Sequence, residues 1–60
     1  MKILITGDMG FVGTETKKVL NENEHDVVGY DLMNGKDVRD YGQFLRFCQA
    51  EKPDRILHLA

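Results

Sequence analysis

The sequence is poor in several residue types, and these shortages exclude some common classes of protein. Its one cysteine, Cys48, cannot form an internal disulfide, so we expect a reduced thiol packed in the core. The apolar run at residues 3–5 is far shorter than a signal-peptide core or the ~18 residues of a membrane span. A soluble, cytoplasmic protein without membrane contact is therefore predicted.

No chemical signature of a nucleic-acid, nucleotide-triphosphate or metal site is present. The ten acidic and eight basic residues give a net charge of −2, and neither sign forms a block, so no nucleic-acid partner is expected. The Walker pattern of a nucleoside triphosphatase is missing. His25 and His58 have no metal-ligand spacing, and His58, in an apolar run, is interpreted as a packing residue.

Glycine, by contrast, is regularly spaced near the start of the chain. Gly7, Gly10 and Gly13 separate the β-branched-rich run at 3–5, typical of a buried parallel strand, from a predicted helix over residues 11–22. The predicted apolar stripe of this helix consists of Val12, Thr16 (through its methyl group), Val19 and Leu20.

A strand, three glycines and a helix in this order are the context of a dinucleotide-binding loop. One glycine allows the tight turn, one lets the backbone approach a pyrophosphate, and one lets helix and strand pack closely. The free N–H groups of the first helical turn would face the anion. Without this context, the spacing of the glycines alone would be a weak signal, and ordinary turn residues would be the simpler interpretation.

A second apolar segment, residues 27–30, ends at an acid that suits the same interpretation. Asp31 follows Gly13 by 18 positions and Gly7 by 24. This spacing brackets the offset of about 20 for an acid that accepts hydrogen bonds from the adenosine ribose. An exposed acid in a strand-end turn is the alternative.

The remaining pattern predicts a second helix and a third strand. A turn at Asn34-Gly35 precedes a predicted helix over residues 41–51, at whose start Asp40 and Gln43 resemble a capping box. Residues 56–60 are predicted to form the third strand. Right-handed crossovers make the sheet parallel. If both crossovers step the same way, the strand order is 3-2-1, both helices lie on one face, and the first strand is an open edge.

Four motifs, TGDMGFVG, VVGYD, DVRD and ILHLA, together resemble the N-terminal part of the extended short-chain dehydrogenases/reductases, the family of NAD-dependent nucleotide-sugar epimerases and dehydratases. The resemblance implies an α/β fold: the N-terminal βαβαβ half, with three parallel strands, of a Rossmann doubly wound domain. Residues 1–60 would then be a partial NAD(P)-binding domain. It also implies NAD as cofactor and a nucleotide sugar as substrate of the parent enzyme. The implied cofactor-binding residues are Gly7, Gly10, Phe11, Val12, Gly13, Asp31, Asp37, Val38, Leu59 and Ala60. In similar enzymes the residue at Asp37 contacts the adenine amino group, and that at Val38 lines the adenine pocket.

The catalytic residues of that family have no match in this chain. The family uses a serine or threonine and a tyrosine with a lysine four positions later; this chain has no serine, and Tyr30 and Tyr41 are followed by Asn34 and Leu45. The 60 residues alone are therefore predicted to be inactive, although the parent reaction, an isomerase- or oxidoreductase-type reaction, would begin with hydride transfer to the nicotinamide. The alternative is a non-catalytic dinucleotide-sensing or interaction protein. We also expect self-association, or association with the rest of a larger protein.

Overall fold

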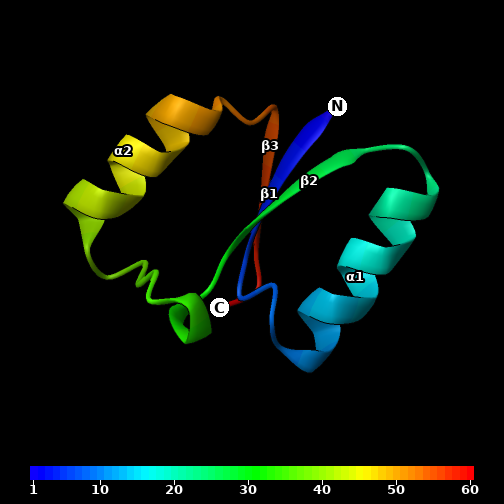
Figure 1. Ribbon diagram of the computed structural model, residues 1–60, viewed down its shortest axis with the longest axis horizontal. Coiled ribbons are helices and arrows are strands. Elements are labelled where there is room, and N and C mark those ends of the chain that lie inside the picture. Colours follow the sequence, from blue (N-terminus) through cyan, green and yellow to red (C-terminus); the bar gives the residue numbers. More distant parts are fainter.

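The computed structural model describes residues 1–60 and shows one parallel sheet between two α-helices (Figure 1). The elements in chain order are β1 (Lys2–Thr6), α1 (Phe11–Glu22), β2 (Asp26–Tyr30), the 3-10 helix η1 (Leu32–Asn34), α2 (Tyr41–Glu51) and β3 (Arg55–His58). The predicted elements are all present, but β3 stops at His58, so Leu59 and Ala60 follow the strand. None of the helices has the length and apolar character needed to span a membrane.

The strand order is β2-β1-β3, so the predicted order 3-2-1 is wrong. Both pairings are parallel, and Ile3 lies opposite Val27 on one side and Arg55 on the other. The second crossover returns past β1 instead of continuing beyond β2. Consequently β1 is the central strand and not the open edge that the sequence suggested.

This strand order also corrects the predicted positions of the helices. Two right-handed crossovers that step in opposite directions place their helices on opposite faces of the sheet, and Figure 1 shows α1 and α2 on either side of it. The change of direction falls between β1 and β3. In open parallel sheets, ligands bind outside the carboxyl ends of the strands at such a point. The strand order therefore places one such switch point within residues 1–60.

The core is centred on β1, whose Ile3, Leu4 and Ile5 are buried between the helices. On one face α1 approaches through the buried Gly13, not through the predicted stripe: Val12 and Val19 are 61% and 54% exposed. A helix with glycine at the contact can come close to the sheet, and this turns the two valines outward. Half of the predicted stripe was therefore wrong.

On the other face α2 packs through aromatic side chains. The ring of Tyr30 meets those of Phe44 and Phe47 edge to face, each at 4.9 Å between centroids. Asp40 caps α2 by accepting the Gln43 N–H (3.1 Å). The Gln43 side chain accepts the Tyr30 hydroxyl (3.3 Å) instead of returning to the cap, so the capping box is half formed.

The thiol of Cys48 is free, as predicted, but it is only partly buried on α2.

Candidate functional site

The three glycines of the loop between β1 and α1 have different surroundings. Gly7 has a left-handed φ of 73°, and a Cβ there would lie 2.9 Å from the Ala60 nitrogen. A Cβ on Gly13 would overlap the Gly7 carbonyl oxygen and approach the Asp8 Cα to 2.7 Å. A Cβ on Gly10 meets only the Gly7 oxygen, at an ordinary 3.5 Å. Packing therefore requires the first and third glycines, whereas Gly10 faces open space.

The first turn of α1 offers unpaired backbone donors beside Gly10. The Thr14 N–H bonds to the Gly10 carbonyl (2.9 Å), so helix geometry leaves the N–H groups of Phe11, Val12 and Gly13 without intrahelical partners. The side chains of Phe11 and Val12 are exposed. These residues can therefore contribute their backbone to a bound anion, which the positive end of the helix dipole also attracts.

Asp31 lies at the carboxyl end of β2 and reaches across to the glycine loop. It is 8% exposed, and its Oδ2 accepts the Met9 N–H (2.9 Å). Its Oδ1 accepts the Met33 N–H (2.8 Å) of the following 3-10 turn. Because an ionised carboxylate has about four acceptor positions, each oxygen can accept a further hydrogen bond. The spacing in the sequence thus corresponds to a direct contact between acid and loop.

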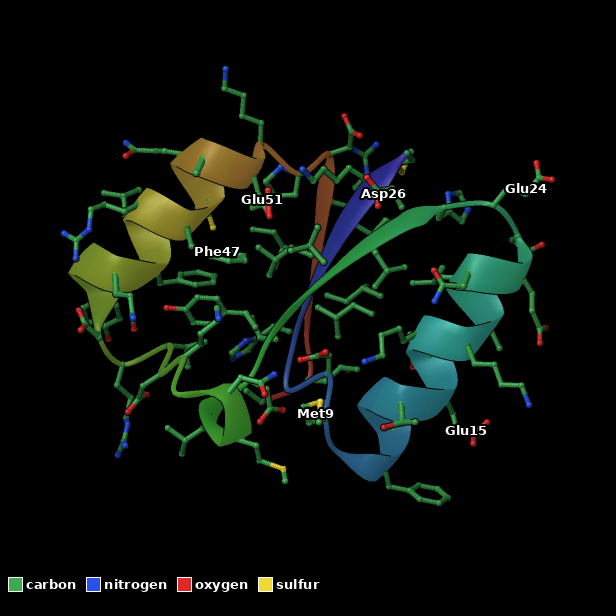
Figure 2. All side chains as sticks on the ribbon, viewed as in Figure 1. Met9, Glu15, Glu24, Asp26, Phe47 and Glu51 are labelled. Atoms are coloured by element: carbon green, nitrogen blue, oxygen red, sulfur yellow. The ribbon has the colours of Figure 1, made fainter.

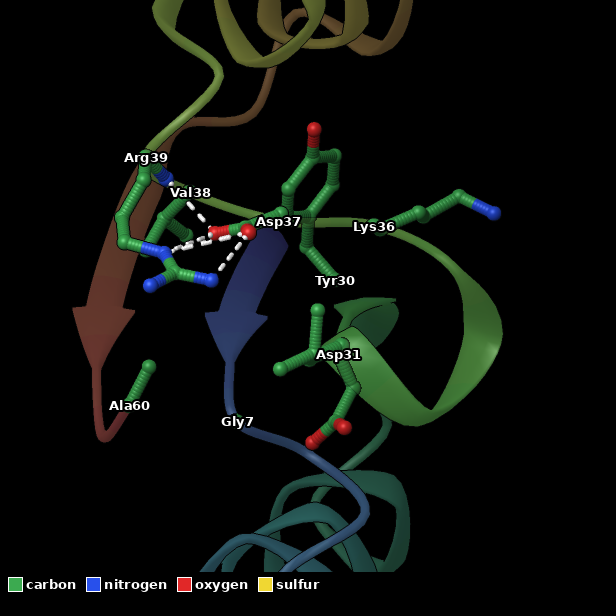
Figure 3. A pocket seen from close by; sticks show the side chains of 9 residues that line it. Gly7, Tyr30, Asp31, Lys36, Asp37, Val38, Arg39 and Ala60 are labelled. Carbon is green, nitrogen blue, oxygen red and sulfur yellow. Dashed lines mark hydrogen bonds and ion pairs between the residues drawn. The ribbon is translucent and has the colours of Figure 1, made fainter.

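A cavity of about 320 Å³ opens at this end of the sheet (Figure 3). Its volume falls at the lower end of the ~300–1,000 Å³ typical of small-molecule sites. Five of the predicted cofactor residues line it: Gly7, Asp31, Asp37, Val38 and Ala60. Its other lining residues, which sequence reasoning did not select, are Tyr30, Leu32, Lys36 and Arg39.

The other predicted cofactor residues lie outside the cavity wall. Gly10, Phe11, Val12 and Gly13 form the loop and the start of α1. The Leu59 N–H bonds to the Thr6 carbonyl (3.0 Å) and to its hydroxyl (3.1 Å), which ties the chain after β3 to the end of β1. The same hydroxyl contacts His58 Nδ1 (2.7 Å), although His58 as a whole is exposed and not a core residue.

Asp37 is held by Arg39, two positions later. The guanidinium Nη2 lies 2.7 Å from Oδ2, and Nε lies 3.0 Å from Oδ1. These hydrogen bonds lower the pKa of Asp37 and raise the pKa of Arg39. Asp37 is therefore an ionised acceptor at neutral pH. The pattern Asp-x-Arg in a loop was the available sequence signal for this pair.

Tyr30 forms part of the cavity wall but is not placed for proton transfer. Its side chain is fully buried, and its hydroxyl donates to Gln43. Burial raises the pKa of the phenol, and the carboxylates of Asp40 and Asp37 raise it further. It therefore stays protonated and serves as a packing residue.

A buried acid inside the glycine loop was also missed. Asp8 is buried, its Oδ2 pairs with Lys17 Nζ at 3.1 Å, and its Oδ1 has no partner. A Cβ on Gly29 would overlap this carboxylate, so Gly29 provides the space for it. The charge of Lys17 offsets a negative charge that would otherwise oppose an anion at the loop.

Taken together, these features fit a dinucleotide. Gly10 leaves an open approach to the backbone, the start of α1 presents free N–H groups, and Asp31 has spare acceptor capacity at the wall of the cavity. These are the parts that bind pyrophosphate and ribose in doubly wound folds. The fold and the site define a Rossmann-type dinucleotide-binding unit, of which the three parallel strands form one half.

A comparison with family models identifies the family. The model of the NAD-dependent epimerase/dehydratase family matches residues 3–60. The chain therefore belongs to this family, and its cofactor is NAD. Comparisons with curated proteins and with solved structures gave no match.

Proposed function

We propose that the chain is the NAD-binding portion of an enzyme that epimerises or dehydrates a nucleotide sugar. The observation that carries this proposal is the hydrogen bond from the Met9 N–H in the glycine loop to Asp31 at the end of β2. It brings the two halves of the expected cofactor site together in a chain of the epimerase/dehydratase family. NAD supplies a hydride acceptor when bound, while these residues bind and orient it. A cytoplasmic location belongs to the same proposal.

We further propose that the catalytic residues of the enzyme lie outside these 60 residues. Tyr30 is buried against Phe44 and Phe47, and Tyr41 at the start of α2 has Leu45, not lysine, four positions later. Residues 1–60 would thus be a partial domain that binds cofactor without turnover.

The test is turnover by the intact protein with NAD and a panel of nucleotide sugars, followed by nuclear magnetic resonance of the products. Conversion of at least one nucleotide sugar, and none by residues 1–60 alone, is expected. NAD binding without conversion of any nucleotide sugar would favour the alternative, a non-catalytic dinucleotide sensor.

Cofactor choice gives a second test of the same site. Asp31 accepts hydrogen bonds and would repel a 2′-phosphate, and the neighbouring residue is Leu32, not an arginine. Titration of the intact protein should show tighter binding of NAD than of NADP. The opposite order would overturn the role of Asp31.

Association with another polypeptide is also part of the proposal. The open edges are the outer sides of β2 and β3, not β1 as expected from the sequence, and all four residues of β3 are exposed. Exposed backbone donors and acceptors at such an edge favour strand pairing. Sedimentation of residues 1–60 alone should show self-association; a well-folded monomer at high concentration with micromolar NAD affinity would contradict this.

A further inference from the structure

The contact between Arg39 and Asp37 is the most elaborate side-chain interaction in the molecule, and it lies on the wall of the cavity (Figure 3). Arg39 reaches the carboxylate by four contacts. Its backbone N–H donates to Oδ1 (2.9 Å), Nε donates to Oδ1 (3.0 Å) and Oδ2 (3.1 Å), and Nη2 donates to Oδ2 (2.7 Å). No other residue donates to this carboxylate, so Arg39 alone sets its orientation.

This pair does little for the stability of the fold. The Arg39 side chain is 80% exposed, and that of Asp37 is 29% exposed. An exposed ion pair contributes little to folding, because solvent screens it and both side chains lose freedom. A planar, bidentate guanidinium is, however, an effective means of fixing one carboxylate in one orientation. The geometry therefore favours a role in the site over a role in the core.

The fixed carboxylate retains one acceptor position. Oδ1 accepts hydrogen bonds from the Arg39 backbone N–H and from Nε. Oδ2 accepts one from Nη2 and shares the Nε–H with Oδ1 at a longer distance of 3.1 Å. A carboxylate has about four lone-pair positions, so Oδ2 can accept one more donor. Val38, Leu32 and Ala60 provide apolar surface in the same cavity. This combination suits a flat ring that carries an N–H donor at its edge.

We propose that Arg39 is a positioning residue that orients Asp37 so that the site prefers a purine with an exocyclic amine to a purine with a carbonyl oxygen at that position. The proposal rests on the proposed NAD-binding function. A carbonyl oxygen would face the carboxylate as acceptor against acceptor, which excludes a hydrogen bond. Arg39 acts through Asp37 and does not itself contact the ligand.

The test compares the affinities of the intact protein for NAD and for nicotinamide hypoxanthine dinucleotide, which differ in this one group. We expect the unmodified protein to prefer NAD by roughly tenfold, the scale of one hydrogen bond to a charged acceptor. Arg39→Met should reduce the preference to within about threefold, which is below half of such a bond. Arg46→Met, which removes an exposed arginine of α2 outside the cavity, is the matched control and should keep the full preference.

A double substitution separates action through Asp37 from direct contact. Asp37→Ala should abolish the preference, and adding Arg39→Met to it should cause no further change. An equal loss of affinity for both dinucleotides in Arg39→Met, independent of Asp37, would show that Arg39 contacts the ligand and would overturn the proposal. Tighter NAD binding by Arg39→Met would also overturn it, because Arg39 would then block the acceptor.

Two further measurements distinguish a failure of the positioning role of Arg39 from a failure of the NAD-binding function. If Arg39→Met does not fold, as judged by thermal melting, Arg39→Lys gives the same test, because lysine keeps the charge but cannot bridge both oxygens. Full preference in Arg39→Lys would overturn the positioning role. Failure of the unmodified protein to bind either dinucleotide would instead contradict the NAD-binding function itself.

Discussion

The two crossovers of the sheet are packed by different means. In β1–α1–β2 the contact is backbone against backbone, because Gly13 of α1 lies on the Gly7 carbonyl and on Asp8. In β2–α2–β3 the contact is made by rings, because Tyr30 meets both Phe44 and Phe47 edge to face. Phe47 lies on the side of α2 that faces the sheet (Figure 2). The first arrangement brings free N–H groups to the surface of a tight loop. The second holds its helix further from the sheet.

The largest effect should come from adding a side chain to Gly13, where the backbone of α1 packs directly on the backbone of the loop. In Gly13→Val the new side chain would overlap the Gly7 oxygen and the Asp8 backbone, so the loop and α1 must separate. We expect a loss of about 3 kcal/mol or more in the free energy of unfolding. Urea denaturation of the intact protein measures this.

Gly42→Ala in the exposed first turn of α2 is the control, because the nearest atom is the flexible end of Arg46 at 3.4 Å. It should be neutral or slightly stabilising, by up to ~1 kcal/mol. If Gly13→Val were no less stable than this control, the backbone packing described for α1 would be incorrect.

Removing an aromatic ring from the second crossover should lower the free energy of unfolding by less than Gly13→Val does. Phe44→Ala removes an edge-to-face contact with Tyr30 and part of the cover over β2. Since Phe44 is only half-buried, we expect about 2 kcal/mol, below the ~3–5 of a fully buried phenylalanine. Denaturation of Leu45→Ala, an exposed neighbour, should show almost no change. Equal effects of the two substitutions would mean that the rings do not hold α2.

Substitution of the middle glycine, Gly10, should affect the binding of the ligand more than the stability of the fold. Gly10→Val adds a side chain into open space, so stability should change by less than ~1 kcal/mol while NAD affinity falls by more than ~10-fold. Thermal melting with and without NAD separates the two quantities. Gly10→Ala should weaken binding less. An equal loss of stability and affinity would indicate a purely structural glycine.

The smallest effect should come from the cap of α2. Asp40→Ala leaves the Gln43 N–H without its acceptor and should lower the free energy of unfolding by about 1 kcal/mol. Asp40→Asn keeps an acceptor oxygen and should behave nearly as the unmodified protein does. Denaturation curves that do not distinguish Ala from Asn would show that the cap contributes nothing.

Local features of the fold were predictable from the sequence, whereas its spatial order was not. Glycine spacing and the offset of Asp31 predicted the loop, α1 and the acid beside them, because these depend on neighbours along the chain. The order β2-β1-β3 depends on the direction in which the second crossover steps, and no residue near Pro53 signals that direction. The outward turn of Val12 and Val19 has the same origin, since it follows from which residue of α1 meets the sheet.

The candidate site likewise combines residues that the sequence predicted with contacts that it did not. The sequence predicted Gly7, Asp31, Asp37, Val38 and Ala60 as cofactor-binding residues, and the structure brings them to one cavity. Two ion pairs at the site were missed: that of Arg39 with Asp37 depends on the loop after the 3-10 turn, and that of Lys17 with Asp8 depends on the rotation of α1.

The central position of β1 has a consequence for how the chain folds. The Lys2 N–H bonds to Asp54, 52 positions later, and the Thr6 carbonyl receives the Leu59 N–H. On a ribosome, one side of the first strand stays unpaired until the last strand is made. Contacts over such separations cost loop-closure entropy before they become favourable and slow folding. We therefore expect the sheet to close in one late step, with β1 exposed to chaperones until then.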